Sequence, residues 1–198
     1  MNFKADKNIK SAADILCAGG VVVIPTDTVY GIAARPDCTA AVERIHTIKG
    51  RRSGKPVALL AADRESVIEF CGETSETALK LMDAFWPGAL TLVLPCAEGF
   101  EGFRVPDHKQ TRKLIKACGG TLRVTSANLS GSMPALSAVE ALKDVGLKAD
   151  LVVDDGVSPG GVASTVVKIE ADGAMTVLRE GAISTEDILR ICKYPQRN

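Results

Sequence analysis

Aromatic residues are scarce in this chain, and neither charge sign is in excess. Aromatics make up only 4% of the 198 residues, which argues against a stacking platform for single-stranded nucleic acid. Lys plus Arg and Asp plus Glu number 24 each, so a site for a polyanion must be a local cluster rather than a property of the whole surface. The two histidines, His46 and His108, lie at no metal-ligand spacing with a cysteine. The sequence therefore predicts no metal site.

Long apolar runs and targeting signals are missing as well. No stretch approaches the roughly 18 residues that a membrane-spanning helix needs. The first residues, MNFKADKNIKSAADIL, carry acids and a broken apolar pattern, unlike a secretory signal. The six cysteines include no C-x-x-C pair, which is typical of reduced thiols that fill a core. These absences predict a cytoplasmic protein with no membrane partner.

Short apolar runs alternate with segments of helical spacing. The runs 21–24 and 57–61 are too short for helices and almost wholly apolar, which predicts strands covered on both faces. Further strands are predicted at 89–94, 102–105, 121–124 and 151–153, and a hairpin from 166–169 and 175–179 across Ala-Asp-Gly. The predicted helix caps are Asn8, Thr39, Asp63, Ser75, Ser137 and Thr185. We predict a single α/β domain over residues 1–198, with a twisted mixed sheet and packed helices.

The segment KGRRSGKP gathers cations in a short space. Lys49, Arg51, Arg52 and Lys55 lie within seven positions, separated by Gly and Ser. Small residues let a ligand approach the backbone, while guanidinium and ammonium groups suit phosphate oxygens. The alternative is a solvated basic loop after a helix C-terminus, where cations are favourable in any case. The segment is not a P-loop, because proline follows the lysine and no glycine lies five positions before Gly54.

Two hydroxyl-rich segments each follow a predicted strand. They are TDTVYG at 26–31 and TSANLSG at 125–131, and α/β sheets bind ligands at the carboxyl ends of their strands. The amide of Asn128 suits a base or a phosphate, and the serines can donate to an anion. The alternative is a turn whose Thr, Ser and Asp side chains satisfy their own backbone. No histidine lies near Ser126 in the sequence, so a serine nucleophile with a histidine base has weak support.

Charged side chains also stand in or beside apolar strands. Arg123 and Arg179 lie within such strands, where a cation is costly unless it is paired or bound to an anion. A structural ion pair is the alternative to an anion site. Asp154 and Asp155 are adjacent and would point apart on an extended strand, which gives little support to a joint role in holding Mg²⁺.

Seven segments, in this order, together resemble the YrdC-type threonylcarbamoyl-AMP synthases, also called TsaC-like proteins. They cover nearly the whole chain, and the family's paired signature of Lys-x-Arg followed by Ser-x-Asn is present. The segments are PTDTVYGIAA (25–34), KGRRSGKP (49–56), FWPGALTLVL (85–94), FRVPDH (103–108), TSANLSG (125–131), ASTVV (163–167) and LREG (178–181).

The resemblance implies a reaction in which L-threonine, bicarbonate and ATP give threonylcarbamoyl-AMP and diphosphate. The product would pass to the machinery that forms threonylcarbamoyladenosine in tRNA. Both reacting partners are anionic, so the site must neutralise charge and align them, with Mg²⁺ on the phosphates and no protein nucleophile. The family further implies a large, positively lined concave cavity on the sheet that holds both substrates.

The resemblance also assigns site residues by matching position. Those that would contact ATP are Lys49, Arg51, Lys55, Ser126, Asn128 and Arg179, with Lys49, Arg51, Ser126 and Asn128 as the catalytic group. Those that would contact threonine are Thr28, Arg104 and Ser164, with Thr26 and Tyr30 shaping that end.

The chain departs from the family pattern at two positions and in length. Leu60 stands where some members have a histidine that touches threonine, and Lys168 where many have Asp, which leaves threonine specificity open. Longer members carry an additional C-terminal domain, so this chain is predicted to be the short, single-domain type. Two other functions stay open: a double-stranded RNA- or tRNA-binding paralogue that uses the same cavity, and a carbamoyl transferase that acts on another amine.

Overall fold

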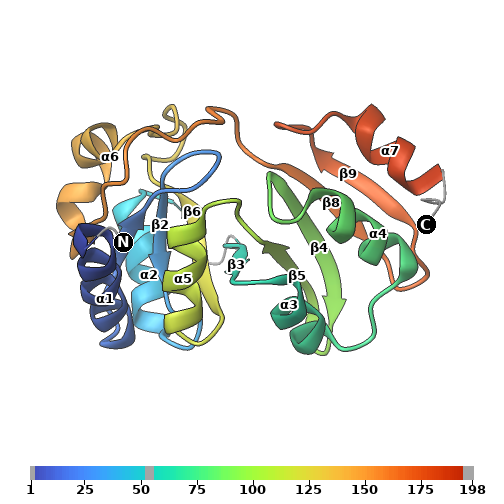
Figure 1. The fold of residues 1–198 in the computed structure, drawn as a ribbon, viewed down its shortest axis with the longest axis horizontal. Helices are drawn as coiled ribbons and strands as arrows, with labels where there is room; N and C mark the ends of the chain where they lie inside the picture. The colour runs from blue at the N-terminus through green and yellow to red at the C-terminus, as the bar shows by residue number, and fades with distance from the viewer. Residues whose placement is uncertain (1–2, 52–55, 194–198) are drawn as a thin grey trace.

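The computed structural model describes residues 3–51 and 56–193 of the chain. Within these ranges nine strands form one sheet in the order β7-β1-β2-β6-β3-β5-β4-β8-β9 (Figure 1). The pairs β1–β7, β3–β5 and β4–β8 are parallel and the others antiparallel. The strands are β1 (Val22–Ile24), β2 (Gly31–Ala34), β3 (Leu59–Ala61), β4 (Leu90–Cys96), β5 (Gly99–Arg104), β6 (Thr121–Ser126), β7 (Leu151–Val152), β8 (Thr165–Ile169) and β9 (Met175–Arg179). The predicted α/β fold with a mixed sheet is confirmed.

Helices cover both faces of one half of this sheet and one face of the other half. Apolar residues of α1 and α5 pack on one side of β1, β2 and β6, those of α2 and α6 on the opposite side, and those of α3, α4 and α7 on one side of β4 and β8. The helices are α1 (Phe3–Cys17), α2 (Thr39–Ile48), α3 (Arg64–Cys71), α4 (Glu76–Phe85), α5 (Lys109–Ala117), α6 (Ala138–Asp144) and α7 (Thr185–Lys193), with a 3₁₀ turn η1 (Gly146–Lys148). No helix within the described ranges combines the length and apolarity that crossing a bilayer requires.

Several helices begin where the sequence predicts a cap. The side chains of Asp63, Ser75 and Ser137 accept hydrogen bonds from backbone N–H groups in the first turns of α3, α4 and α6, as predicted. The cap predicted at Asn8 is wrong, because α1 begins at Phe3 and Asn8 lies inside it. An amide side chain is a cap signal only where the helix pattern does not already extend upstream of it.

Two further predicted caps are wrong by one residue. Thr39 is the first residue of α2, and the N-cap Cys38 makes no side-chain capping bond. At α7 the Ser184 hydroxyl accepts from the Asp187 N–H at 3.1 Å, so Thr185 is already helical. In α7 a neighbouring hydroxyl one position earlier takes the capping role.

One strand was not predicted, and another pairing was missed. β2 begins at Gly31, which the sequence pattern placed in a turn, and its GIAA sequence has little of the branched character that marks a strand. β4 and β5 form an antiparallel hairpin in which Pro95 lies opposite Phe100, whereas the prediction gave two shorter strands without pairing them. Proline near a strand end lowers the strand signal.

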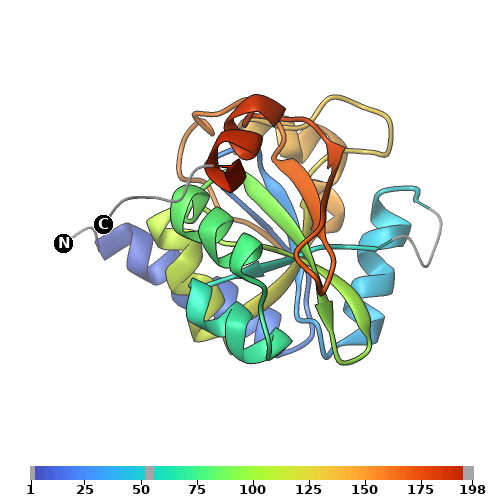
Figure 2. The ribbon, with the colours of Figure 1, turned by 90° about the vertical axis from the view of Figure 1, so that its right-hand side faces the viewer.

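The half of the sheet formed by β5, β4, β8 and β9 has helices on one face only. We call its other face the open face, and this face positions the site. Leu90, Leu92 and Leu94 of β4 pack against α3, α4 and α7, so the alternate residues of β4 point to the other face. On β5, Phe103 belongs to the packed face and Arg104 to the open one; Phe100, also on the open face, is 47% exposed. Figure 2 shows α3 and α4 on one side of these strands and α2 on the other. The open face and α2 therefore share one side of the molecule.

Candidate active site

The loop between β1 and β2 forms a buried polar cluster with Arg104. The Thr26 hydroxyl donates to the Val29 carbonyl at 2.7 Å and lies 3.0 Å from the Thr28 hydroxyl. Arg104 Nη1 donates to Thr28 Oγ1 at 2.8 Å, and Nη2 pairs with the Asp27 carboxylate. Residue 104 enters this cluster because it ends β5, on the open face of the sheet. The structure thus brings together three of the residues predicted for threonine: Thr26, Thr28 and Arg104.

Arg104 is a buried cation with donors to spare. It is only 6% exposed, and its Nε donates to the Gly88 carbonyl at 2.9 Å. A guanidinium has five N–H donors, so bonds to Gly88, Thr28 and Asp27 leave capacity for a ligand oxygen. Burial lowers the pKa of Arg104 and Asp27 opposes that shift, but arginine keeps its charge in proteins. The cluster is therefore suited to a carboxylate.

Lys49 lies at the C-terminal end of α2 and reaches the loop after β6. Its Nζ donates to the carbonyl oxygens of Ser126 and, at 2.7 Å, of Asn128. The residue is 4% exposed, and its pKa is lowered to about 8 by burial and by the nearby Arg51 charge, with Asp144 opposing the shift. Lys49 is thus a desolvated ammonium held by backbone dipoles rather than by a carboxylate at contact distance. Two of its three N–H donors are used among the described residues, which leaves the third for a ligand.

Arg51 lies next to this ammonium and is only partly satisfied. Its Nη2 donates to the Pro56 carbonyl at 2.9 Å, and its Nη1 lies 3.4 Å from the Thr125 hydroxyl. Its Nε is buried and has no hydrogen-bond partner among the described residues. Burial lowers the pKa of Arg51. Lys55, predicted to contact ATP, lies outside the described residues.

The side chain of Asn128 has fewer groups left for a ligand than its position in the sequence predicts. Its side-chain Nδ2 donates to the carbonyls of Leu129 and Ser132 at 2.9 and 2.7 Å, so both amide N–H groups stabilise their own loop. The amide oxygen is buried without a partner among the described residues. An amide oxygen can only accept, so at this side chain a hydroxyl or an amino group of a ligand is a better partner than a phosphate oxygen.

A third polar cluster joins β4 to the residue just before β8. Ser164 Oγ lies 2.8 Å from the Thr91 hydroxyl, and Arg179 Nη2 donates to the Ser164 carbonyl at 2.8 Å. A Cβ on Gly181 would lie 2.2 Å from the Ala163 carbonyl oxygen, so only glycine lets the two backbone segments approach this closely. Ser164 and Arg179, predicted for different substrates, are thus direct neighbours.

Strand register brings the predicted segments to one edge of the sheet. Gly31 lies opposite Ser126, and the Ala127 N–H donates to the Tyr30 carbonyl at 2.7 Å. The Tyr30 phenol is fully buried and donates to the Gly156 carbonyl at 2.6 Å; burial raises its pKa. It anchors the glycine-rich segment 156–161 rather than facing outward. The presence of Arg123 in an apolar strand is explained by a structural ion pair, because the guanidinium pairs with Glu101 at 2.6 Å.

Two residues that support the β1–β2 loop were not predicted for the site. The Thr111 hydroxyl donates to the Pro25 carbonyl at 2.7 Å. His108 caps α5 by accepting from the Thr111 N–H, and its Nε2 lies 3.4 Å from an Asp155 oxygen. Burial lowers the pKa of His108, while Asp155, Asp27 and Asp107 oppose that shift. The signal in the sequence is a polar residue three positions before a threonine at a helix start, but only the fold shows what the threonine touches.

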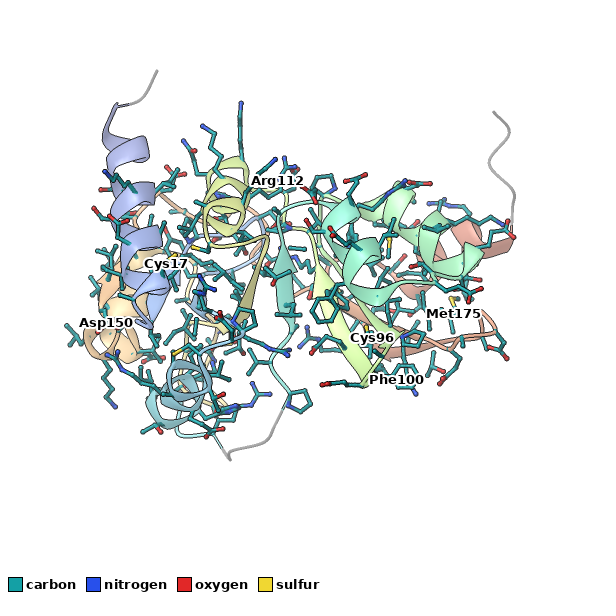
Figure 3. The ribbon with its side chains drawn as sticks, turned by 90° about the horizontal axis from the view of Figure 1, so that it is seen from below. Cys17, Cys96, Phe100, Arg112, Asp150 and Met175 are labelled. Carbon is teal, nitrogen blue, oxygen red and sulfur yellow. The ribbon has the colours of Figure 1, made fainter. Side chains whose placement is uncertain are left out.

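The predicted large basic cavity stays a prediction. The described residues line a small cavity of about 20 Å³ behind Pro25 and a groove of about 280 Å³ beside Trp86. Neither is lined by Lys49, Arg51 or Arg104. Lys49 at the end of α2, Arg104 at the end of β5 and the hydroxyls of the β1–β2 loop nevertheless supply cations and hydroxyls. Figure 3 draws the side chains of the described residues on the ribbon.

The fold is that of an α/β protein with a mixed sheet, and the buried cations and hydroxyls at its strand ends are suited to an anion. The Sua5/YciO/YrdC family model, described as telomere recombination, matches residues 14–181. The chain therefore belongs to this family, and the resemblance seen in the sequence is confirmed.

Relatives and solved structures agree with this assignment. A threonylcarbamoyl-AMP synthase of Bacillus subtilis is 38% identical over 194 residues, which cover 92% of this chain and 56% of the relative. The structure of Pyrococcus abyssi Sua5 complexed with L-threonine is 33% identical, with a TM-score of 0.87 over 93% of this chain and 57% of that one. Escherichia coli YciO is 27% identical, with a TM-score of 0.81 over 92% of this chain and 93% of that one. The chain thus spans just over half the length of the first two proteins.

Proposed function

We propose that this chain is a threonylcarbamoyl-AMP synthase, which forms threonylcarbamoyl-AMP and diphosphate from L-threonine, bicarbonate and ATP. The name carried by the Bacillus subtilis relative and the threonine bound by Pyrococcus abyssi Sua5 support this proposal. The observation in this chain that carries it is Lys49, a buried ammonium that uses two of its three donors among the described residues and lies beside a partly satisfied Arg51. Such a pair is suited to the phosphates of ATP.

The threonine end is proposed to lie at Thr28, Arg104 and Ser164. Arg104 has unused N–H donors for the substrate carboxylate. The Thr28 hydroxyl accepts from Arg104 and, because the Thr26 proton is on the Val29 carbonyl, directs its own proton to Thr26 Oγ1. Thr26 and Tyr30 would hold this loop in shape. Ser164 lies against Arg179, so the threonine end and the ATP end would meet at this pair.

The chemistry needs alignment and charge neutralisation more than a protein nucleophile. The amine of threonine attacks the carbon of CO₂ or bicarbonate, releasing water in the latter case, and gives a carbamate. A carbamate oxygen then attacks the α-phosphorus, the bond from that phosphorus to the bridging oxygen breaks, and diphosphate leaves. Lys49 and Arg51 would stabilise the charge on the phosphates, and the fixed position of Arg104 would hold the carbamate in line. Ser126 would donate to an oxygen rather than form a covalent bond.

Mg²⁺ is proposed to enter with ATP. Among the described residues, no group of three or more His, Cys, Asp or Glu side chains is arranged to hold a metal ion, and Asp27 is already paired with Arg104. The phosphate oxygens and water would therefore supply most ligands, which is the usual arrangement for Mg²⁺ on a nucleotide. When bound, the ion would neutralise charge on the leaving diphosphate.

The proposal is tested by threonine-dependent release of diphosphate from ATP in the presence of labelled bicarbonate, with threonylcarbamoyl-AMP identified by mass. Lys49→Ala and Arg51→Ala should abolish turnover while leaving the folded structure intact. Arg44→Ala is the matched control, because Arg44 pairs with Asp150 away from the site and its loss should leave turnover unchanged. Diphosphate release that does not depend on threonine would contradict the proposal. Delivery of the product to the tRNA-modifying machinery and a cytoplasmic location are further parts of it.

Steeply salt-dependent tRNA binding without ATP binding would instead favour the RNA-binding alternative. Equal turnover with other amino acids would favour a transferase of broader specificity, to which Leu60 and Lys168 would then contribute. Both tRNA binding and turnover with other amino acids can be measured on the same purified protein.

A further inference from the structure

The loop between β1 and β2 leaves both neighbouring strands at Pro25. The pairing of β1 with β2 ends where Ile24 lies opposite Gly31, and its pairing with β7 ends at Val23. Proline has no N–H to donate, so at this position the backbone can be held only through its carbonyl. The support of that carbonyl therefore helps to decide where residues 26–28, which follow directly, are placed.

The side chain of Thr111, in the first turn of α5, supplies this support. Its hydroxyl donates to the Pro25 carbonyl at 2.7 Å, across 86 residues of sequence. Pro25 is buried and Thr111 is only 2% exposed, and the described residues show no other hydrogen bond to this carbonyl. Because a buried carbonyl is costly when it is unbonded, this single bond ties the start of the loop to α5.

His108 orients Thr111 toward the loop. Its Nδ1 accepts from the Thr111 N–H at 3.2 Å and lies 3.0 Å from the Thr111 hydroxyl oxygen. The hydroxyl proton thus has two acceptors within reach, and the Pro25 carbonyl is the nearer of them. The cap of α5 therefore also fixes the direction in which Thr111 donates.

The middle of the same loop is held by backbone groups of the segment 156–161. The N–H groups of Gly160 and Gly161 donate to the carbonyls of Asp27 and Thr28 at 3.0 and 2.9 Å. The side chains of Asp27 and Thr28 in turn hold the guanidinium of Arg104. The position of Arg104 thus depends on a loop whose middle is held by backbone and whose start is held by one hydroxyl.

We propose that Thr111 is a positioning residue for the amino-acid substrate, acting through the β1–β2 loop rather than on the substrate itself. It holds the loop in the conformation in which Asp27 and Thr28 direct Arg104 toward the substrate carboxylate. Without the hydroxyl, the Pro25 carbonyl is unbonded in that conformation, and the loop gains by moving this carbonyl toward water. The fraction of molecules able to bind threonine falls, and the apparent affinity falls with it. The identity of the substrate rests on the proposed function; the role of Thr111 in holding the loop does not.

Kinetics with two variants test the proposal. Thr111→Val removes the hydroxyl at nearly the same shape and should raise the KM for threonine about tenfold. Its kcat should stay within about twofold, because saturating threonine selects the competent loop. Thr111→Ser keeps a hydroxyl and should restore the KM, and the KM for ATP should be unchanged in both. Thr74→Val is the control, since the Thr74 hydroxyl also donates to a backbone carbonyl, that of Gly72, at 3.3 Å.

Hydrogen exchange tests the role of Thr111 without a substrate. In Thr111→Val the amides of Gly160 and Gly161 should exchange about tenfold faster than in the wild type, because the carbonyls that they bond to are displaced for part of the time. Thr111→Ser should exchange as the wild type does. The Val124 amide, which donates to the Ala58 carbonyl at 2.9 Å in the body of the sheet, should be unchanged in both variants.

The proposal is overturned if Thr111→Val leaves the KM for threonine or the exchange of the two glycine amides unchanged, or if Thr111→Ser fails to restore them. Faster exchange at Val124 as well would show a general loss of stability and would also overturn it. If the wild type shows no threonine-dependent turnover, the proposed function fails, and the exchange result alone decides whether Thr111 holds the loop.

Discussion

The charge on Lys49 should make the stability of this protein rise with pH in the alkaline range. Burial lowers its pKa from 10.5 to about 8 in the folded chain, whereas in the unfolded chain the group titrates near its ordinary value. Between these two pH values the unfolded state holds more protons than the folded state, so the free energy of unfolding increases as pH rises. Below about pH 8 both states are protonated and the full cost of the buried charge is present.

The size of the effect follows from the same shift. At about 1.4 kcal/mol per pKa unit, the buried ammonium costs about 3 kcal/mol below pH 8. Raising the pH from about 7.5 to about 9.5 should therefore recover about 2 kcal/mol of it. Lys49→Met removes the titrating group, so the difference between wild type and variant isolates this contribution from the Tyr and Cys groups that titrate nearby in pH. Urea unfolding at the two pH values measures it.

ATP binding should respond in the opposite direction. Phosphates favour the charged form of Lys49, so ATP affinity should fall as pH rises above about 8, while the stability of the free protein increases. If wild type and Lys49→Met gain the same stability between the two pH values, Lys49 does not carry a buried charge and the reasoning fails. Equal ATP affinity at both pH values would remove Lys49 from the phosphate site.

Three other perturbations test the structure at separate points. Asp27→Asn should lower the free energy of unfolding by about 3–5 kcal/mol, because it leaves Arg104 buried with less compensating charge. Added L-threonine should restore part of the loss, and a loss below about 1 kcal/mol would refute the pairing. Gly160→Ala should raise the KM for threonine at least tenfold without loss of fold, since a Cβ there would lie 2.6 Å from the Asp27 carbonyl oxygen; replacing the preceding proline by alanine is the control. The thiols of Cys71 and Cys96 lie 3.1 Å apart, so mild oxidation should link them with a loss of about 2 Da, and peptide mapping that finds other pairs would contradict this geometry.

Local patterns in the sequence predicted what depends on neighbours along the chain. The buried strand before TDTVYG, the caps Asp63, Ser75 and Ser137, and the Ala-Asp-Gly hairpin all follow from short-range signals. The missed strand β2 shows the limit, because GIAA forms a strand through its pairing with β1 and β6 rather than through its own propensity.

The site could not be predicted from such patterns alone. Arg104 reaches Thr28 across 76 residues of sequence, and only strand order brings them together. No sequence pattern predicts that the Asn128 amide donates to carbonyls of its own loop, or that the Tyr30 phenol donates to the Gly156 carbonyl. Roles of this kind depend on tertiary contacts, so the family resemblance located these residues and the structure describes what each of them can still donate or accept.

The most direct test of the proposed site is a crystal structure of this chain with a non-hydrolysable ATP analogue and L-threonine. Phosphate oxygens should lie within hydrogen-bond distance of Lys49 Nζ and Arg51, and the threonine carboxylate within hydrogen-bond distance of Arg104 and Thr28. Both ligands should then occupy one continuous site on the open face of the sheet. Ligand density elsewhere, with Lys49 still bound only to the Ser126 and Asn128 carbonyls, would contradict the assignment.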